Sequence, residues 1–424
     1  MSNSEGIGTT AASTGRPAEV TIAAEPEPRV PGNQAVSLVT NLLAPPGGAK
    51  PNGGQRRRYD RASLGYRKTF LKTLYARVRL PLKLLYCRIF KLSRPLIVVL
   101  TTNMNCNWKC VYCYGDYPSY GTEKNLSTEE MLRMVDDLVT MGCVYAIVHG
   151  GESLLRKDIG YLIDYMKLKG LYVGFITNGQ LFPRRIEELR NVDSLTISLD
   201  GRRENNDKNR GPGTYDMAMT AIKLALKEGF KLRVSATLTR HTMGDVEYLA
   251  ALGKEMKFPV FFSLLYRTDL SAKDDPVSLS AEEIRSTLTT IMQLKRRGYP
   301  IFTSYQNLEY ALRWPYERFN KLYLFEDQVP KDFKKLTCHY SKLKFHIEGD
   351  GTVTPCTIMS SNNFAGKNVR DVGVREAVGH VRDTNTCVAC PHLSQNDWNL
   401  LMDLQPRHVA FLIKEQIKEL TRWF

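Results

Sequence analysis

Apolar, β-branched runs recur six times in the middle of the chain, and stretches with the spacing of amphipathic helices separate them. One of these helical stretches, residues 127–141, opens with Ser127 and Glu130 in the order of a capping box. Strands that alternate with helices predict a parallel sheet with right-handed crossovers. Six units predict an α/β fold, a partial (β/α)6 TIM-type barrel, with its site at the carboxyl ends of the strands. The predicted strands are residues 96–101, 144–148, 172–177, 194–199, 231–238 and 259–265.

A second apolar pattern precedes the barrel, in residues 56–94. Seven apolar residues there are spaced by three or four, which predicts one stripe along a helix, and Pro81 is expected to kink or divide that helix. The stripe consists of Leu71, Leu74, Val78, Leu82, Leu85, Ile89 and Leu92.

The same segment carries most of the charge of the chain. It holds thirteen Lys or Arg and one acid, Asp60, so it contributes a net +12 of the formal +15. A basic amphipathic helix suits the interface of an anionic membrane. The alternative is that the stripe packs on the barrel and the charges are solvated. No nucleic-acid partner is expected, because no nucleic-acid-binding fold or aromatic stacking platform accompanies the charge.

Composition divides the rest of the chain. Residues 1–55 are rich in Gly, Pro, Ala, Ser and Thr, which predicts a disordered tail. The barrel is expected over residues 95–310, a small C-terminal cluster-binding extension over 311–395, and a helical tail over 396–424. No signal peptide or apolar run of membrane-spanning length is evident. We therefore expect a cytoplasmic protein, peripheral on the inner face of the membrane if the basic segment binds lipid.

Three cysteines, Cys106, Cys110 and Cys113, lie on the loop after the first predicted strand. Three thiolates from one loop can hold three irons of a [4Fe–4S] cluster and leave the fourth iron open to a small molecule. A zinc site more often shows paired C-x-x-C units and four ligands of its own. The loop also falls at the end of the barrel where active sites lie.

The cysteine spacing, with Tyr112 just before the third cysteine, resembles the signature of the radical S-adenosylmethionine (radical SAM) enzymes. In that family the open iron chelates SAM, and one electron cleaves SAM to methionine and a 5′-deoxyadenosyl radical that abstracts hydrogen from a substrate. The resemblance also implies an electron donor of the flavodoxin or ferredoxin type.

Other strand ends resemble further segments of this family. Gly150, Gly151 and Glu152 follow the second strand, with Ser153 in place of the usual proline, and Thr177-Asn178-Gly179 ends the third. The resemblance implies that the glycines and Glu152 bind the SAM amino group, that Ser198 and Arg210 contact its carboxylate or ribose, and that Tyr112 lies near the adenine. The implied SAM contacts are Tyr112, Gly150, Gly151, Glu152, Asn178, Ser198 and Arg210.

A second cysteine group comprises Cys338, Cys356, Cys387 and Cys390. Residues 347–355, just before Cys356, predict a hairpin with glycine at the turn. The group resembles the shortened "twitch" form of the SPASM extension, which implies one auxiliary [4Fe–4S] cluster. A structural zinc ion held by the four thiolates is the alternative.

Three functions follow from these patterns. The first is a radical SAM enzyme that abstracts hydrogen from a membrane-associated or lipid-linked substrate. The second is a peptide- or protein-modifying maturase of the SPASM type. The third, which the strand-end motifs disfavour, is a non-catalytic metal-cluster scaffold. The sequence identifies neither the substrate nor a catalytic side chain.

Overall fold

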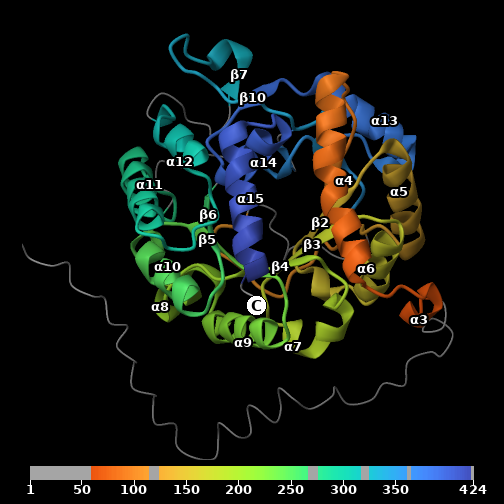
Figure 1. Cartoon of the computed structure of the whole chain (residues 1–424), viewed down its shortest axis with the longest axis horizontal. Coiled ribbons are helices and arrows are strands. Elements are labelled where there is room, and N and C mark those ends of the chain that lie inside the picture. Colours follow the sequence, from red (N-terminus) through yellow and green to blue (C-terminus); the bar gives the residue numbers. More distant parts are fainter. Residues whose placement is uncertain (1–58, 114–123, 266–275, 317–323, 361–363, 422–424) are drawn as a thin grey trace, which may run out of the picture. The chain divides into compact units, whose positions relative to one another are not determined.

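The six predicted strands lie side by side in one parallel sheet (Figure 1). The structure is a computed structural model that describes residues 59–113, 124–265, 276–316, 324–360 and 364–421. The predicted tail over residues 1–55 lies outside this part of the chain. The strands are β1 (Ile97–Thr101), β2 (Tyr145–His149), β3 (Tyr172–Thr177), β4 (Ser194–Ser198), β5 (Leu232–Leu238) and β6 (Val260–Leu264).

Helices follow the strands in the predicted alternation. The first, α5, begins where expected, because Ser127 Oγ accepts from Glu130 N at 3.2 Å and the Glu130 carboxylate accepts from Ser127 N at 2.6 Å. The crossover helices are α5 (Thr128–Met141), α6 (Ile159–Leu168), α7 (Phe182–Arg185), α8 (Arg203–Arg210), α9 (Thr214–Lys227), α10 (Val246–Glu255) and α11 (Ala281–Arg296).

The C-terminal region adds two strands to this sheet. The predicted hairpin is present as β8 (Lys344–Ile347) and β9 (Val353–Thr354), and β8 pairs in parallel with β1. The strand order is therefore β6-β5-β4-β3-β2-β1-β8-β9, an open sheet in which β6 and β9 are the outer strands. The remaining elements are β7 (Leu324–Phe325) and β10 (Cys387–Ala389), which pair with each other, and α12 (Tyr305–Leu312), α13 (Val369–Thr384), α14 (Leu393–Met402) and α15 (Pro406–Thr421).

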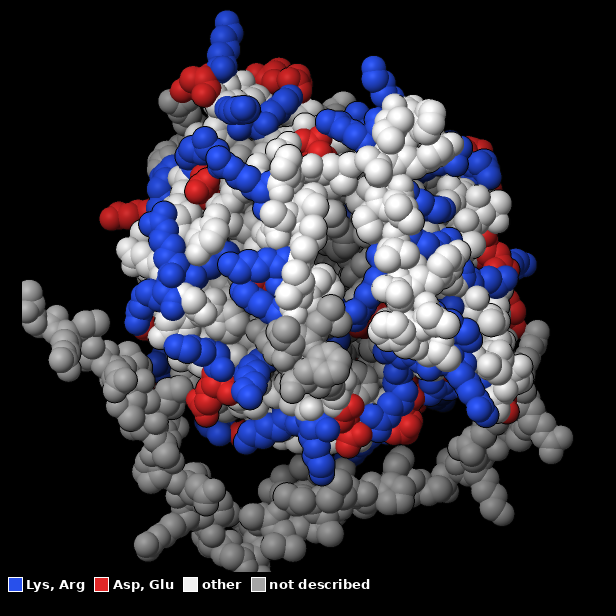
Figure 2. Space-filling model, viewed as in Figure 1, with Lys and Arg blue, Asp and Glu red and all other residues white. Residues whose placement is uncertain are grey.

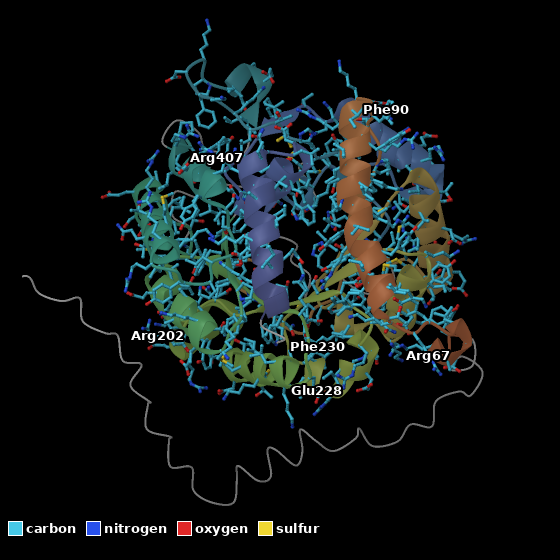
Figure 3. All side chains as sticks on the ribbon, viewed as in Figure 1. Arg67, Phe90, Arg202, Glu228, Phe230 and Arg407 are labelled. Atoms are coloured by element: carbon cyan, nitrogen blue, oxygen red, sulfur yellow. The ribbon has the colours of Figure 1, made fainter. Side chains whose placement is uncertain are left out.

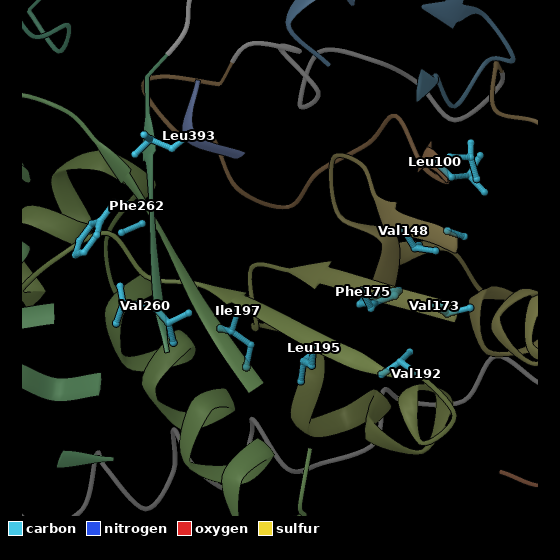
Figure 4. Close-up of a cluster of buried hydrophobic side chains, with 14 of the residues drawn as sticks. Leu100, Val148, Val173, Phe175, Val192, Leu195, Ile197, Val260, Phe262 and Leu393 are labelled. Carbon is cyan, nitrogen blue, oxygen red and sulfur yellow. The ribbon is translucent and has the colours of Figure 1, made fainter. Parts of the chain in front are cut away.

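The two faces of the sheet differ in polarity. Side chains that face the crossover helices, such as Val148, Phe175 and Ile197, are fully buried in one apolar cluster (Figure 4). On β4 and β5 the alternate residues, such as the register partners Thr196 and Arg233, are polar and only partly buried. Because side chains alternate across a strand, these polar residues line the opposite, concave side, which we call the lumen.

The basic segment forms α3 (Arg61–Leu64) and the 20-residue helix α4 (Phe70–Ile89). The helix continues through Pro81, so the prediction that this proline divides it was wrong. Helix α4 packs through Leu80, Leu84 and Cys87 against the starts of β1 and β2. The burial of these side chains offsets the free-energy cost of the backbone hydrogen bond that Pro81 cannot donate.

The predicted stripe faces away from the protein, so the alternative that it packs on the barrel was wrong. Its exposed fractions are 74% for Leu71, 63% for Leu82 and 62% for Ile89, and Leu74, Val78 and Leu85 are also exposed. Only Leu92 is partly buried. Figure 2 shows the resulting band of uncharged surface along α4, bordered by Lys and Arg. Within the described residues, no helix has both the length and the apolar character needed to cross a membrane.

Helix α4 lies across the amino-terminal ends of the strands. Arg79 donates to the carbonyl oxygen of Gly170, just before β3, at 2.7 Å, and Lys83 donates to that of Gly142, just before β2, at 2.9 Å. Lys68, just before α4, donates to the carbonyl oxygen of Val192, ahead of β4, at 2.6 Å. The basic segment and the cysteine loop therefore occupy opposite ends of the sheet.

Candidate active site

The loop after β1 is held by the loop after β2. Backbone N–H groups of Gly151 and Glu152 donate to the carbonyl oxygens of Asn103 and Asn105 at 2.9 and 2.8 Å. The Asn103 amide returns a hydrogen bond to the Glu152 carbonyl oxygen at 3.0 Å. These bonds fix the backbone immediately before Cys106, so the β2 loop positions the first cysteine.

The glycines of this loop are required by that contact. A Cβ atom on Gly151 would lie 2.3 Å from the Asn105 carbonyl oxygen, and one on Gly150 would lie 2.6 Å from that of Asn103. Neither separation is possible for a side chain. The structure thus gives the two glycines a role beyond the implied SAM contact, because they allow close approach of the cysteine loop.

The three cysteines of the loop are partly buried and influence one another. Burial raises the pKa of Cys106 to about 12, and Glu152 and the other two thiols add to the rise. Burial raises the pKa of Cys110 to about 11, although Arg210 acts in the opposite direction. Grouped thiols of this kind become thiolates when a cation binds them, because metal binding releases their protons. The donor set therefore fits an iron cluster.

Glu152 is buried, and protein donors surround its carboxylate. It accepts hydrogen bonds from the Thr177 hydroxyl at 3.0 and 3.1 Å, from Asn178 N at 2.8 Å and from Leu154 N at 2.9 Å. Burial raises its pKa, against the effect of these donors. Glu152 thus joins the ends of β2 and β3, and the Asn178 side chain donates to Asn107 in the cysteine loop at 2.9 Å.

Arg210 and Tyr112 meet at a carboxylate that the sequence analysis did not select, Asp200. Arg210 Nε and Nη2 donate to the two Asp200 oxygens, each at 2.8 Å, and the Tyr112 hydroxyl donates to the same group at 2.7 Å. Thr237 N adds a fourth donor at 2.9 Å. Asp200 therefore ties the cysteine loop to β4, β5 and α8. In the sequence, Asp200 is marked only by its position directly after the fourth predicted strand, two residues beyond Ser198. Ser198 itself is partly exposed on the lumen side.

Two histidines face each other across the lumen side of β2, β1 and β8. Thr101 Oγ1 lies 2.9 Å from His346 Nε2 and 3.5 Å from His149 Nε2. Burial lowers the pKa of His149 to about 4, and the charge of Lys344 adds to this effect. The imidazole of His149 is therefore neutral near pH 7. The Lys344 ammonium lies 4.4 Å from the centre of the Trp398 ring. Sequence reasoning missed these residues because their meeting depends on the pairing of β8 with β1.

The second cysteine group converges from three separate segments of the chain onto one cavity. These cysteines share an apolar cluster with Leu96, Ile97 and the buried face of α4, toward the amino-terminal ends of the strands. Burial raises the pKa of Cys356 to about 12, and the Cys338 thiol adds to the rise. The cavity is lined by all four predicted ligands, Cys338, Cys356, Cys387 and Cys390.

Four thiols around one cavity can hold either a [4Fe–4S] cluster or a tetrahedral zinc ion. Across the part of the chain that the structure describes, no group of three His, Cys, Asp or Glu side chains is placed so that it could hold a metal ion. Cys143 is buried in the main apolar cluster, whereas Cys87, on α4, is buried in the same cluster as the second cysteine group.

Comparison with known proteins identifies the class. Residues 101–253 match the model of the radical SAM superfamily, and they include the three loop cysteines, Glu152 and Arg210. These residues therefore form a radical SAM domain, as the resemblance of the strand-end motifs implied. The cofactors of this family are a [4Fe–4S] cluster and SAM.

Two curated relatives illustrate the range of similar proteins. The chain is 33% identical over 223 residues to the Fe-coproporphyrin III synthase of Methanosarcina barkeri, covering 50% of this chain and 55% of that protein. It is 32% identical over 166 residues to the mycofactocin maturase MftC of Mycolicibacterium smegmatis, covering 38% and 42%. The chain thus spans about half the length of the curated relatives it matches.

Solved structures share the fold. SuiB of Streptococcus suis, bound to S-adenosylmethionine, matches with a TM-score of 0.54 at 16% identity, over 70% of each chain. The protein anSMEcpe with bound AdoMet matches with a TM-score of 0.52 at 19% identity, over 67% of this chain and 80% of that one. Both similarities extend over more of this chain than the family model does.

Proposed function

We propose that this protein cleaves SAM reductively and uses the resulting radical to abstract hydrogen from a substrate bound in the lumen. The observation that supports this most directly is the cysteine loop, which is held by backbone and side-chain bonds at the carboxyl ends of β1, β2 and β3. The ligands of the SAM-binding cluster would be Cys106, Cys110 and Cys113. When bound, that cluster supplies the electron that cleaves SAM to methionine and a 5′-deoxyadenosyl radical.

The remaining residues position and enclose the reactants. Glu152 and Asn178 hold the edges of the SAM site, and Ser198 lies at the end of β4 on the lumen side. Arg210 and Tyr112 are bound to Asp200, so they support the cysteine loop. Contacts from these two residues to SAM are additional predictions. The polar lumen beyond this site would hold the substrate.

The proposed auxiliary cluster would occupy the second cavity. Its ligands would be Cys338, Cys356, Cys387 and Cys390, within the extension predicted over residues 311–395. This cavity and the cysteine loop lie toward opposite ends of the strands, and the lumen runs between them. A substrate in the lumen would therefore lie between two iron–sulfur centres.

The test is SAM cleavage by the reconstituted full-length protein under anaerobic conditions with dithionite. We expect 5′-deoxyadenosine from the wild type and from Cys143→Ala, in which a buried cysteine away from both groups is changed. We expect none from Cys110→Ala. If Cys110→Ala matches the wild type, or no variant forms 5′-deoxyadenosine, the protein is a non-catalytic scaffold. A flavodoxin- or ferredoxin-type donor should replace dithionite.

We further propose that the substrate is membrane-associated and that α4 attaches the protein to an anionic membrane surface. The support is the exposed stripe together with the net +12 of residues 56–94. Burial of a Leu or Ile side chain contributes about 1.5–3 kcal/mol, and each cation near an anionic surface contributes about 1 kcal/mol. Helix α4 lies at the end of the sheet away from the cysteine loop, so a membrane-borne substrate would enter the lumen from the amino-terminal ends of the strands.

Vesicle co-sedimentation tests this attachment. The wild type should bind phosphatidylglycerol-containing vesicles, less strongly at high salt, and a Leu71→Ser, Leu82→Ser, Ile89→Ser triple variant should lose most of that binding. A Leu155→Ser, Leu168→Ser variant, which changes exposed apolar residues outside α4, should bind as the wild type does. Equal binding by the triple variant would refute the role of the stripe.

The second candidate is a peptide-modifying maturase. It is favoured by the similarity to the mycofactocin maturase MftC, whereas the Fe-coproporphyrin III synthase points to a different substrate class. The basic segment would then hold an acidic peptide. Binding of a labelled acidic peptide, lost on changing the basic residues of α4 and unaffected by the loss of the apolar stripe, would favour this candidate over membrane attachment.

A further inference from the structure

Helix α15 carries an apolar stripe on its outer side. Ile413 and Ile417 are one turn apart, and their exposed fractions are 55% and 56%. Pro406 and Ala410 continue the same line at helical spacing and are exposed as well. The opposite side of the helix packs on the protein, where His408 is buried. Helix α15 therefore has one face against the protein and an apolar line on the face that points away from it.

Cations lie in a row beside this stripe. Arg407 and Lys414 are exposed, and neither forms an ion pair with a residue that the structure describes. Lys418 extends the row and pairs with Glu415 at 2.7 Å. An apolar line with cations along one side is typical of a helix that lies in the interface of an anionic membrane.

Helix α15 borders the lumen at the amino-terminal ends of β5 and β6. The rings of Phe411 and Phe302 are in contact, with their centres 5.9 Å apart. Phe302 N donates to the carbonyl oxygen of Val260, where β6 begins, at 2.8 Å. Cζ of Arg233, on the lumen side of β5, lies 3.6 Å from the centre of the Phe302 ring. The helix is thus fixed at the same end of the sheet as α4.

The two helices share one face of the molecule. Arg88 Nη2, near the end of α4, lies 3.2 Å from Asp403 Oδ1, three residues before α15 begins. Figure 3 shows Phe90 at the end of α4 and Arg407 at the start of α15 toward the same edge of the view, so the helices run in opposite directions. Uncharged surface follows both helices on the face seen in Figure 2. One flat surface would therefore contact both stripes.

We propose that α15 is a second membrane-binding element, and that the stripes of α4 and α15 lie together in the interface of an anionic bilayer. The inference rests on the proposed attachment through α4. A single helix on a surface leaves the protein free to rotate about the helix axis, whereas two separate helices fix its orientation. Helix α4 crosses the starts of β2 to β4, and α15 lies beside β5 and β6. A membrane-borne substrate would then reach the lumen between the two helices.

The first test removes the apolar side chains of α15 without a change of charge. Glutamine forms helices at least as well as isoleucine, so Ile413→Gln with Ile417→Gln should leave α15 folded. We expect this variant to bind phosphatidylglycerol-containing vesicles at least about tenfold more weakly than the wild type, because two side chains no longer enter the interface. Leu155→Gln, which changes an exposed apolar residue in the loop after β2, should bind as the wild type does.

The second test uses the wild-type chain and does not depend on the folding of a variant. Vesicles of the same composition carry a phospholipid with a photoreactive diazirine in its acyl chain, and mass spectrometry locates the residues that it labels. Peptides that contain Leu82 of α4 and Ile413 of α15 should both be labelled. The peptide that contains Leu155 should not be labelled.

The outcomes separate the role of α15 from the attachment itself. Labelling of α4 without α15, or wild-type binding by the Ile413→Gln, Ile417→Gln variant, would overturn the role of α15 and leave the attachment through α4 standing. If the wild type does not bind vesicles, the attachment fails and this inference fails with it. A wild type that is dimeric without lipid in sedimentation velocity, together with a monomeric variant, would overturn the membrane in favour of a second copy of this chain.

Discussion

The carboxylate of Asp200 offers the sharpest test of how the active site is held together. It is fully buried and accepts hydrogen bonds from Arg210, Tyr112 and Thr237 N. Asp200→Ala would leave the Arg210 guanidinium, whose side chain is only 9% exposed, without its counterion. Removal of one partner from a buried ion pair costs about 3–5 kcal/mol.

This cost should be visible in thermal unfolding. The compact unit that contains the barrel, from Gln55 to Phe424, has 370 residues. An unfolding entropy of about 2.1 cal/mol/K per residue gives roughly 1.3 °C per kcal/mol, so we expect Asp200→Ala to lower Tm by about 4–6 °C. Circular dichroism of the anaerobically reconstituted protein measures this shift.

A matched control lies in the helix that carries Arg210. Arg203 pairs with Asp216, and both side chains are more than half exposed, so Arg203→Gln should cost less than about 1 kcal/mol. Asp200→Ala should also weaken cluster absorbance, because the Asp200 network holds Tyr112 between the second and third cysteines. If Asp200→Ala and Arg203→Gln melt at the same temperature, the argument that Asp200 organises the site is refuted.

Three further predictions concern the two cysteine groups and the lumen. Gly151→Ala should abolish cluster assembly, measured by absorbance and iron content, because its Cβ atom would lie 2.3 Å from a backbone oxygen, whereas Gly244→Ala, with no atom within 4 Å, should be neutral. The wild type should bind about eight irons per chain and Cys356→Ala about four, and a wild type with about four irons and one zinc would contradict the auxiliary cluster. The folded pKa of His149, about 4, lies below its unfolded value of about 6.5, so its contribution to stability is present above pH 6.5 and is lost as the pH falls toward 4. His149→Gln should flatten the stability profile over this window by up to about 3 kcal/mol in urea unfolding, and an unchanged slope would show that the imidazole does not titrate as proposed.

The strands and the first cysteine group were predictable because their signals are local. Each strand is buried on at least one face, so it needs a short run of apolar residues. That run can be recognised from the strand's own sequence, without knowledge of its neighbours. The three cysteines lie within a stretch of eight residues, and the parallel arrangement requires their loop to lie at the carboxyl end of β1. The capping box of α5 is likewise set by residues three apart.

The sequence alone therefore determined the order of the six strand–helix units, the radical SAM motifs and the charge of the basic segment. Only the tertiary structure decided which face of α4 is buried, because the helix has apolar residues on two faces and the sheet contacts just one. It also decided that β8 pairs with β1, which brings His346 to Thr101 and His149 across some two hundred residues of chain. Asp200 and Glu152 acquire their donors in the same way, from strands distant in sequence. Such contacts leave no periodic trace, because their geometry arises when separate elements pack together.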